Sequence, residues 1–345
     1  MSIDALLEIS SLPNHAPAFD KITDDDYLPA IETAIKDARK NIETIRDQES
    51  PPSFENTIVA LETSSEKLDQ AMSIFYNQLS AVGGDKLHEI AEKVGPVSAE
   101  FSNDIMLDEK LFARVKAVYD AKDELDLTEE QKTLLDNSYK GFVRSGALLD
   151  EEKKKRFREI SQESSILGPQ FMNNAKKSME AFELIIKDEK DLSGIPEGAI
   201  EAAKMAAEEK GHTGHYLFTL DFPSYLPVIQ YADNRDIREK IWRAMATRAW
   251  SDDGSDPYDN AENCKKIARL RHERANLLGF KTHAHYVLER RMAETPDTVL
   301  KFLDKLKTAY KPAAEKDLAD LKAFAKDEHG LDDLKPWDAT YYSEK

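Results

Sequence analysis

Apolar residues at helical spacing constrain the fold more than any other feature of this sequence. They form one stripe between Thr23 and Ser50, and a second stripe between Ser53 and Leu79 that alternates at steps of four and three. Such a stripe marks the buried face of a helix, and the second spacing is typical of the seam between two antiparallel helices. The stripes consist of Leu28, Ile31, Ile35, Ala38, Ile42 and Ile45, and of Phe54, Ile58, Leu61, Ser65, Leu68, Met72, Phe75 and Leu79.

Glycines, prolines and capping residues divide the remaining sequence into further helices. Gly279 and Gly330 are expected to end two of them, and Gly95-Pro96 predicts a kink in the third helix. The sequence therefore predicts a mainly α fold, a multi-helix array of antiparallel helices. Beyond the first two helices, we expect helices at 85–107, 109–122, 128–145, 150–180, 196–210, 234–250, 258–278, 281–291 and 296–328.

One small β-sheet near 182–187 and 215–222 is predicted to interrupt the helices. Both segments are rich in apolar and aromatic residues, and Gly214 and Pro223 bound the second one, as is typical of short strands. Because one helix separates the strands, the sheet would be parallel if that helix is a crossover connection. Pro223 and Pro227 are expected to interrupt any long regular element after the second strand.

The sequence divides into three parts. Residues 1–22 contain several prolines and predict an N-terminal arm on the surface, whereas residues 23–148 predict a helical subdomain. Residues 149–345 predict a second helical subdomain that carries the small sheet and is truncated at its C-terminal end. The expected truncation follows from Pro336-Trp337-Asp338, which begins a helix with no stop signal and leaves aromatic residues with little downstream chain to pack against. We therefore expect the chain to be the front half of a longer protein.

The charge balance disfavours some classes of partner. The chain has 48 Lys and Arg against 66 Asp and Glu, a formal net charge of −18, which disfavours binding to the polyanions nucleic acid and anionic membrane. The single cysteine, Cys264, excludes an internal disulfide and is typical of a reducing compartment. The N-terminus has no basic segment, and no apolar run reaches membrane-spanning length. The sequence therefore predicts a cytoplasmic protein that binds neither nucleic acid nor membrane.

Two segments imitate the zinc motif HExxH, in which histidines at i and i+4 share one helix face and the glutamate acts as base. In residues 88–92 the i+4 position holds Glu92, and in residues 272–276 it holds Asn276. Two further histidine pairs lack the spacing or the rigid backbone for one ion: they are His212 with His215 and His283 with His285. The sequence therefore predicts no catalytic residue and no metal ligand in this chain.

Several stretches resemble one enzyme family. The longest are LFTLDFPSYLPVIQYADNRDIREKIWRAMATRA (217–249), LRHERANLLGFKTHAHYVLERRMAETP (270–296) and LKPWDATYYSEK (334–345). They resemble the zinc metallopeptidases related to thimet oligopeptidase, oligopeptidase A and peptidyl-dipeptidase (dipeptidyl carboxypeptidase). SFENTIVALE (53–62) and NDIMLDEKLFARV (103–115) also resemble this family, so the resemblance covers nearly the whole chain.

The resemblance implies a reaction and a division of roles between two halves. In the family, a zinc-bound water activated by the motif glutamate attacks the carbonyl of a short peptide, and the zinc ligands lie in the second half. No HExxH motif occurs in this chain. The resemblance therefore implies zinc for the full-length protein and none for this chain. The chain would form helical walls of a channel for short peptides, would be inactive alone, and would have the missing C-terminal catalytic half as its partner.

Tyr225, Tyr231 and Trp250 are the candidate substrate-channel residues. Aromatic side chains near the end of a strand suit peptide contact, and they suit a core position equally well.

Two questions stay open at this point. Residues 103–115 are closer to dipeptidyl carboxypeptidases, whereas residues 215–250 are closer to endopeptidases. The alternative to an enzyme fragment is a standalone helical module that binds peptides or proteins without enzymatic activity. Helices that lack partners would expose apolar surface, so we also expect self-association or marginal stability.

Overall fold

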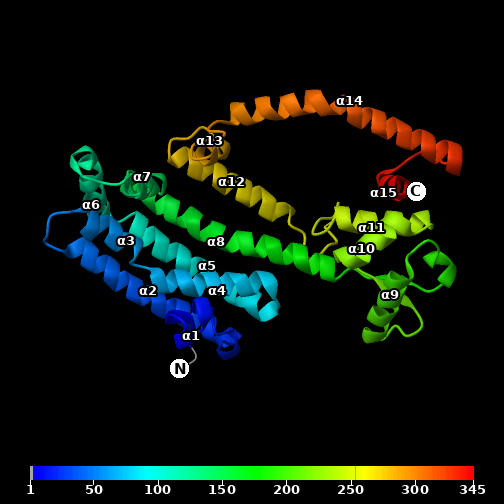
Figure 1. Cartoon of the computed structure of the whole chain (residues 1–345), viewed down its shortest axis with the longest axis horizontal. Helices are drawn as coiled ribbons and strands as arrows, with labels where there is room; N and C mark the ends of the chain where they lie inside the picture. The colour runs from blue at the N-terminus through cyan, green and yellow to red at the C-terminus, as the bar shows by residue number, and fades with distance from the viewer. Residues whose placement is uncertain (1–2, 253) are drawn as a thin grey trace. The chain divides into compact units, whose positions relative to one another are not determined.

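The computed structural model describes residues 3–252 and 254–345, and Figure 1 shows their helices and strands. Helices dominate these residues, and two short strands form a small sheet. The prediction of a mainly α fold with one small sheet is confirmed. The described residues fall into two compact units. The first unit consists of the described residues up to Gln170 and of Lys266–Tyr286. The second unit consists of the described residues within Phe171–Lys265 and of Val287–Lys345.

The first unit is built from helices joined by short turns. Its first long helix begins at a capping box, in which the backbone N–H of Thr23 donates to Asp26, and three acidic residues occupy its first turn, where the helix dipole favours negative charge. The elements are α1 (Asp4–Leu7), α2 (Asp24–Asp47), the π-helical turn η3 (Phe54–Val59), α3 (Ala60–Glu62), α4 (Glu66–Ala81), α5 (Asp85–Met106), α6 (Glu109–Asp120) and α7 (Glu129–Arg144). Parts of α8 (Glu151–Glu180), α12 (Ala261–Leu277) and α13 (His283–Leu288) belong to each unit.

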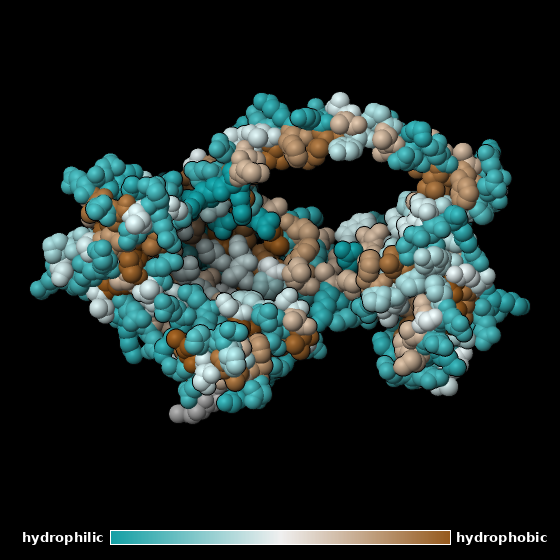
Figure 2. Space-filling view, in the orientation of Figure 1, coloured by the Kyte–Doolittle hydropathy of each residue, from teal (hydrophilic) through white to brown (hydrophobic). Residues whose placement is uncertain are grey.

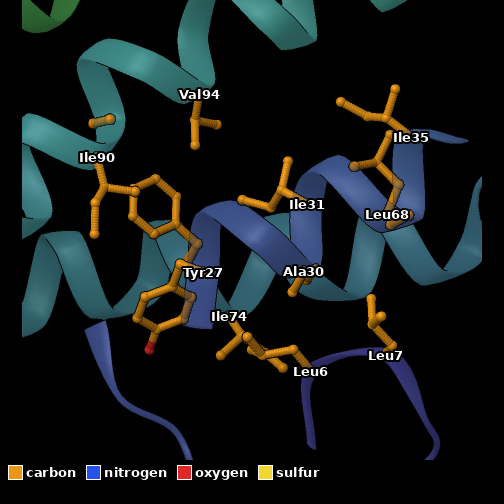
Figure 3. Close-up of a cluster of buried hydrophobic side chains, with 14 of the residues drawn as sticks. Leu6, Leu7, Tyr27, Ala30, Ile31, Ile35, Leu68, Ile74, Ile90 and Val94 are labelled. Atoms are coloured by element: carbon orange, nitrogen blue, oxygen red, sulfur yellow. The ribbon is translucent and has the colours of Figure 1, made fainter. Parts of the chain in front are cut away.

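A core of the first unit lies among α1, α2, α4 and α5 (Figure 3). Ile31 of α2, Phe75 of α4 and Val94 of α5 are completely buried in it. α1 adds Leu6 and Leu7 to the same core, so the N-terminal segment is anchored to the helical body. The apolar stripe predicted after Thr23 is thus the face of α2 that packs against its neighbouring helices.

The segment predicted as one helix from Ser53 to Leu79 is divided into η3, α3 and α4. The break falls at Thr63-Ser64-Ser65, where side-chain hydroxyls bond to the backbone: Ser64 Oγ donates to the carbonyl of Leu61 at 2.7 Å. Such local bonds compete with helical ones. In addition, Asn41 Nδ2 donates to the carbonyl of Ser64 at 2.9 Å and so satisfies a group that the break exposes. The prediction of an uninterrupted helix was wrong because it counted apolar spacing and not these hydroxyl groups.

The second unit has its own core, formed by the small sheet and the helices around it. Phe218, Leu220, Val228 and Ile241 are almost completely buried there. Its elements are β1 (Leu184–Ile186), α9 (Glu197–Glu209), β2 (Tyr216–Phe218), α10 (Phe222–Tyr231), α11 (Arg235–Ala246), α14 (Pro296–His329) and α15 (Pro336–Glu344).

The two strands are antiparallel, with Ile185 opposite Leu217. The expectation of a parallel pair was therefore wrong. It assumed that α9 is a simple crossover, but the connection also contains a 3-10 turn at Glu189–Leu192 and turns at Gly194 and Gly211. These additional turns bring the chain into β2 from the end opposite to the one that a single crossover would use.

α10 occupies the segment where two prolines were expected to interrupt regular structure, so that prediction was also wrong. Pro223 lies in the first turn of α10, where a backbone N–H has no helical partner in any case. Pro227 lies inside the helix and removes one hydrogen bond. The burial of Val228 and Ile229 in the unit stabilises the helix despite this loss.

α15 packs against α10 and α11, and an ion-pair cluster around Asp338 joins it to α11. Asp338, which is completely buried, accepts hydrogen bonds from Arg235 (Nη2 to Oδ2, 2.7 Å) and from Arg238 (Nη2 to Oδ1, 2.8 Å). The guanidinium carbon of Arg238 also lies 3.9 Å from the ring centroid of Tyr341. Trp337 and Tyr341 are buried. Their partners are upstream residues, which the local sequence does not indicate.

Candidate functional site

A cavity of about 280 Å³ in the second unit combines aromatic, cationic and hydroxyl side chains. Its walls come from the C-terminal part of α8, from Leu220 after β2, from the end of α11 and from the loop that follows α11. This volume is close to the lower limit for small-ligand pockets. The lining residues are Ser178, Ala181, Phe182, Leu220, Ala244, Thr247, Arg248, Trp250, Asp256, Pro257 and Tyr258.

The loop after α11 is fastened to α8 by one hydroxyl group. Ser178 Oγ accepts a hydrogen bond from the backbone N–H of Ala249 at 2.8 Å and donates one to Asp256 Oδ2 at 2.8 Å. The carbonyl of Ala249 accepts from the N–H of Asn260, also at 2.8 Å. Ala249 itself has φ 56°, in the left-handed region that costs a non-glycine residue roughly 1–2 kcal/mol. These bonds hold Ala249 in this unfavourable conformation.

The two charged residues of the cavity differ in their surroundings. Both carboxylate oxygens of Asp256 accept hydrogen bonds, from Ser178 Oγ and from the N–H of Tyr258. Arg248 is exposed, and its Nη1 donates to the carbonyl of Met245 at 2.7 Å. No ion pair joins Arg248 to a carboxylate among residues 3–252 and 254–345. The cavity therefore offers one guanidinium whose charge no described neighbour neutralises.

The three predicted channel residues are not brought together. Trp250 lines the cavity and is 46% exposed. Tyr225 is half-buried against the core of the second unit, where burial raises the pKa of its phenol. Tyr231 Oη donates to Glu344 Oε2 at 3.4 Å and so links α10 to α15. Arg248, which was not predicted as a site residue, lines the same cavity as Trp250. Its place two residues before Trp250 was the only feature of the sequence that could have indicated this.

Glu273 and His283, two of the residues considered as metal ligands, lie in surroundings that do not suit a zinc ion. Arg156 donates to Glu273 through Nε at 2.6 Å and through Nη2 at 2.9 Å, and these bonds hold the pKa of Glu273 below its usual range. Burial, with Arg274 and Arg271 nearby, lowers the pKa of His283, and such cationic neighbours also repel a metal ion. Within the part of the chain that the structure describes, no three His, Cys, Asp or Glu side chains are grouped to hold a metal.

Helices of the described residues are also too short or too polar to cross a membrane.

The sequence comparison shows which family of proteins the chain resembles. Residues 228–345, which contain the end of α10, the helices from α11 to α15 and the loop of the cavity, match the sequence profile of peptidase family M3. The resemblance to zinc metallopeptidases is therefore confirmed, and this chain is related to the M3 peptidases.

Particular relatives cover nearly the whole chain. It is 39% identical to oligopeptidase A of Escherichia coli over 335 residues, which are 96% of this chain and 49% of that protein. It is 31% identical to the dipeptidyl carboxypeptidase of Escherichia coli over 344 residues, 100% of this chain and 50% of that protein. A probable cytosolic oligopeptidase A of Arabidopsis thaliana is 32% identical over 95% of this chain. The chain thus spans about half the length of the curated relatives that it matches.

Proposed function

We propose that this chain is the N-terminal, non-catalytic portion of a zinc-dependent oligopeptidase of the oligopeptidase A or dipeptidyl carboxypeptidase type. It would form helical walls of a channel that admits short peptides, and it would be inactive alone. One observation carries the proposal: the chain aligns over nearly its full length with about half of oligopeptidase A, yet it contains no HExxH motif. Zinc would belong to the complete protein and would be bound by the missing C-terminal catalytic half.

The purified chain is expected to show no peptidase activity above the blank, because it contains no grouped metal ligands among its described residues. A blocked short peptide, assayed with and without added zinc, tests this expectation, with Escherichia coli oligopeptidase A as the positive control. Bound zinc is measured in the same sample. Turnover near the rate of the control, together with stoichiometric zinc, would contradict the proposal.

A cytoplasmic location is part of the same proposal. It is supported by the single cysteine of the chain and by the cytosolic assignment in the name of the Arabidopsis thaliana relative.

The second candidate function is a standalone helical module that binds peptides or proteins without enzymatic activity. The cavity around Trp250 favours this alternative, because it is a binding feature that needs no other half. The reading frame that encodes the chain separates the two functions. Continuation past Lys345 into an HExxH segment supports the enzyme portion, whereas a stop codon there supports the standalone module.

Within either function, we propose that the cavity contacts peptides through the ring of Trp250 and the guanidinium of Arg248. Trp250→Ala is expected to raise the Kd of a short peptide about tenfold, as is typical when a central aromatic contact is lost. Arg248→Gln is expected to abolish any preference for a free peptide carboxylate over an amidated terminus, because the charge-assisted hydrogen bond is removed.

Calorimetric titration of the chain with one peptide in both forms measures these effects. Lys240→Gln removes an exposed charge from α11 outside the cavity, and Tyr225→Phe keeps a ring that lies away from it. Both control variants are expected to bind like the natural chain. An equal loss of affinity in Lys240→Gln and Arg248→Gln would show that overall charge, and not the cavity, determines binding.

A further inference from the structure

α14 carries several large apolar side chains that its own unit leaves exposed. Five of its large apolar side chains are between 46% and 68% exposed, and Ala325 alone is buried among its residues. Figure 2 shows brown and tan side chains along this helix. These exposed residues are Leu300, Phe302, Leu303, Tyr310 and Leu318. Helices of soluble proteins normally bury a surface of this kind.

The apolar residues of α14 follow the spacing of a packing seam. Val299, Leu303, Leu306, Tyr310 and Ala313 succeed one another at steps of four and three. At about 100° per residue, this places them on one side of the helix. The opposite side is polar and includes Lys301, Thr308, Glu315 and Lys322. We call the first set the α14 seam; its regular spacing distinguishes it from scattered exposed residues.

The seam continues into a groove at the C-terminal end of α14. This groove has a volume of about 630 Å³ and lies between α14 and α15. Leu318, Leu321, Phe324 and Tyr342 supply its apolar lining, and Asp317, Asp320, Ser343 and Lys345 supply its polar rim. A helix of 34 residues is about 50 Å long. The seam and the groove together extend over residues 299–324 of this helix.

We propose that the α14 seam and the adjoining groove form the docking surface for the other half of the peptidase polypeptide, the part of the relatives that this chain does not span. This inference rests on the proposed function. Two observations favour this occupant. The seam lies within residues 228–345, the region shared with the M3 peptidases, and the chain spans only 49% of oligopeptidase A. A second copy is a poorer occupant, because each copy carries a net charge of −18 and the copies repel one another.

Thiol protection tests this assignment. In a Cys264→Ser background, single cysteines replace Leu303 or Tyr310 on the seam, and Thr308 or Glu315 on the polar side. These side chains are exposed, so the substitutions do not disturb a core, and equal helical circular dichroism verifies this. The probe is the part of Escherichia coli oligopeptidase A that the alignment leaves uncovered, co-expressed with the full chain. Size-exclusion chromatography reports the complex, and iodoacetamide reports thiol exposure.

The expected result is a complex in which alkylation slows at least tenfold at positions 303 and 310 and changes less than twofold at positions 308 and 315. A complex with no slowing at the seam overturns this inference and leaves the proposed function intact. Absence of any complex overturns both. Slow alkylation of the seam in the chain alone also overturns the inference. If the alkylation rate depends on protein concentration, a second copy of the chain covers the seam. If the rate does not depend on concentration, the chain itself covers the seam.

Discussion

Replacing Asp338 with alanine is expected to destabilise the second unit by about 3–5 kcal/mol, the usual cost of removing one partner from a buried ion pair. Asp338 is completely buried and accepts hydrogen bonds from both Arg235 and Arg238. Arg238 is almost completely buried as well. Its Nη1 would still donate to the carbonyl of Ala232 at 2.7 Å, but a neutral carbonyl does not balance the charge. The variant therefore retains an uncompensated guanidinium in the core.

Urea unfolding of the full chain measures this loss when it is followed by tryptophan fluorescence. All three tryptophans of the chain belong to the second unit; they are Trp242, Trp250 and Trp337. The control variant is Asp333→Ala, which removes an exposed carboxylate that pairs with Lys335 on the surface. Its expected effect is within about 0.5 kcal/mol. A loss below about 1 kcal/mol in Asp338→Ala would mean that the cluster contributes no more than a surface pair.

The same carboxylate predicts how stability depends on pH. Burial by itself would raise the pKa of Asp338, but hydrogen bonds from Arg235 and Arg238 outweigh this effect and hold the pKa below its ordinary value. A carboxylate with a depressed pKa stabilises the fold above its unfolded pKa of about 3.9, and this stabilisation is lost as the pH falls through the folded pKa. Stability is therefore expected to be level above about pH 5 and to decrease below about pH 4.

Unfolding free energies measured at a series of pH values, in the natural chain and in Asp338→Ala, check this dependence. The variant lacks the titrating group, so its stability is expected to fall less steeply in acid. Equal acid slopes would assign the pH dependence to other carboxylates, among them Asp233, whose pKa is held low by hydrogen bonds from Ser193 and Tyr341.

Gly194→Ala is the second substitution with a large expected effect. Gly194 has φ 85°, and a Cβ atom there would lie 2.1 Å from the carbonyl oxygen of Tyr231 and 2.8 Å from Asp233 Oδ1. The neighbouring carbonyl of Ser193 accepts from the N–H of Asp233 at 2.8 Å, so the two backbone segments cannot separate without breaking this bond. The strain of the left-handed backbone and the overpacking together predict that the free energy of unfolding decreases by roughly 2–5 kcal/mol.

Gly211→Ala separates these two causes. Gly211 has φ 80°, almost the same as Gly194, but a Cβ atom there would have no neighbour within 4 Å. In this variant only the strain of the left-handed backbone is expected to lower the free energy of unfolding, by roughly 1–2 kcal/mol. The difference between the variants, measured by the same urea titration, is the cost of the close contact. If the two losses were equal, the approach of residue 194 to α10 would have no energetic importance.

Long helices with regular apolar spacing were predictable from the sequence. Helices were expected at 150–180 and 296–328, and α8 and α14 span Glu151–Glu180 and Pro296–His329. Local spacing is sufficient here because each helix repeats one pattern over many turns. α11 ends at Ala246 and not near residue 250; the difference is the loop that Ser178 fastens through Ala249, a contact from a distant helix.

Features that depend on distant residues were not predictable. α10 forms despite two prolines because its apolar residues are buried by the rest of its unit, and the partners of Asp338 lie about a hundred residues upstream. At the candidate site, the aromatic residue Trp250 was predicted from residue type alone. The position of Arg248 in the cavity could not be predicted, because it depends on contacts with residues that are distant in the sequence.

The packing of α15 on α10 has a consequence for biosynthesis. Residues 222–231 leave the ribosome long before residues 336–344, yet they depend on the later segment for part of their burial. A helix with an internal proline has little stability by itself. During about a hundred further rounds of elongation, α10 therefore lacks the contacts with α15 that complete its packing. In this period chaperones or proteases can reach the α10 segment.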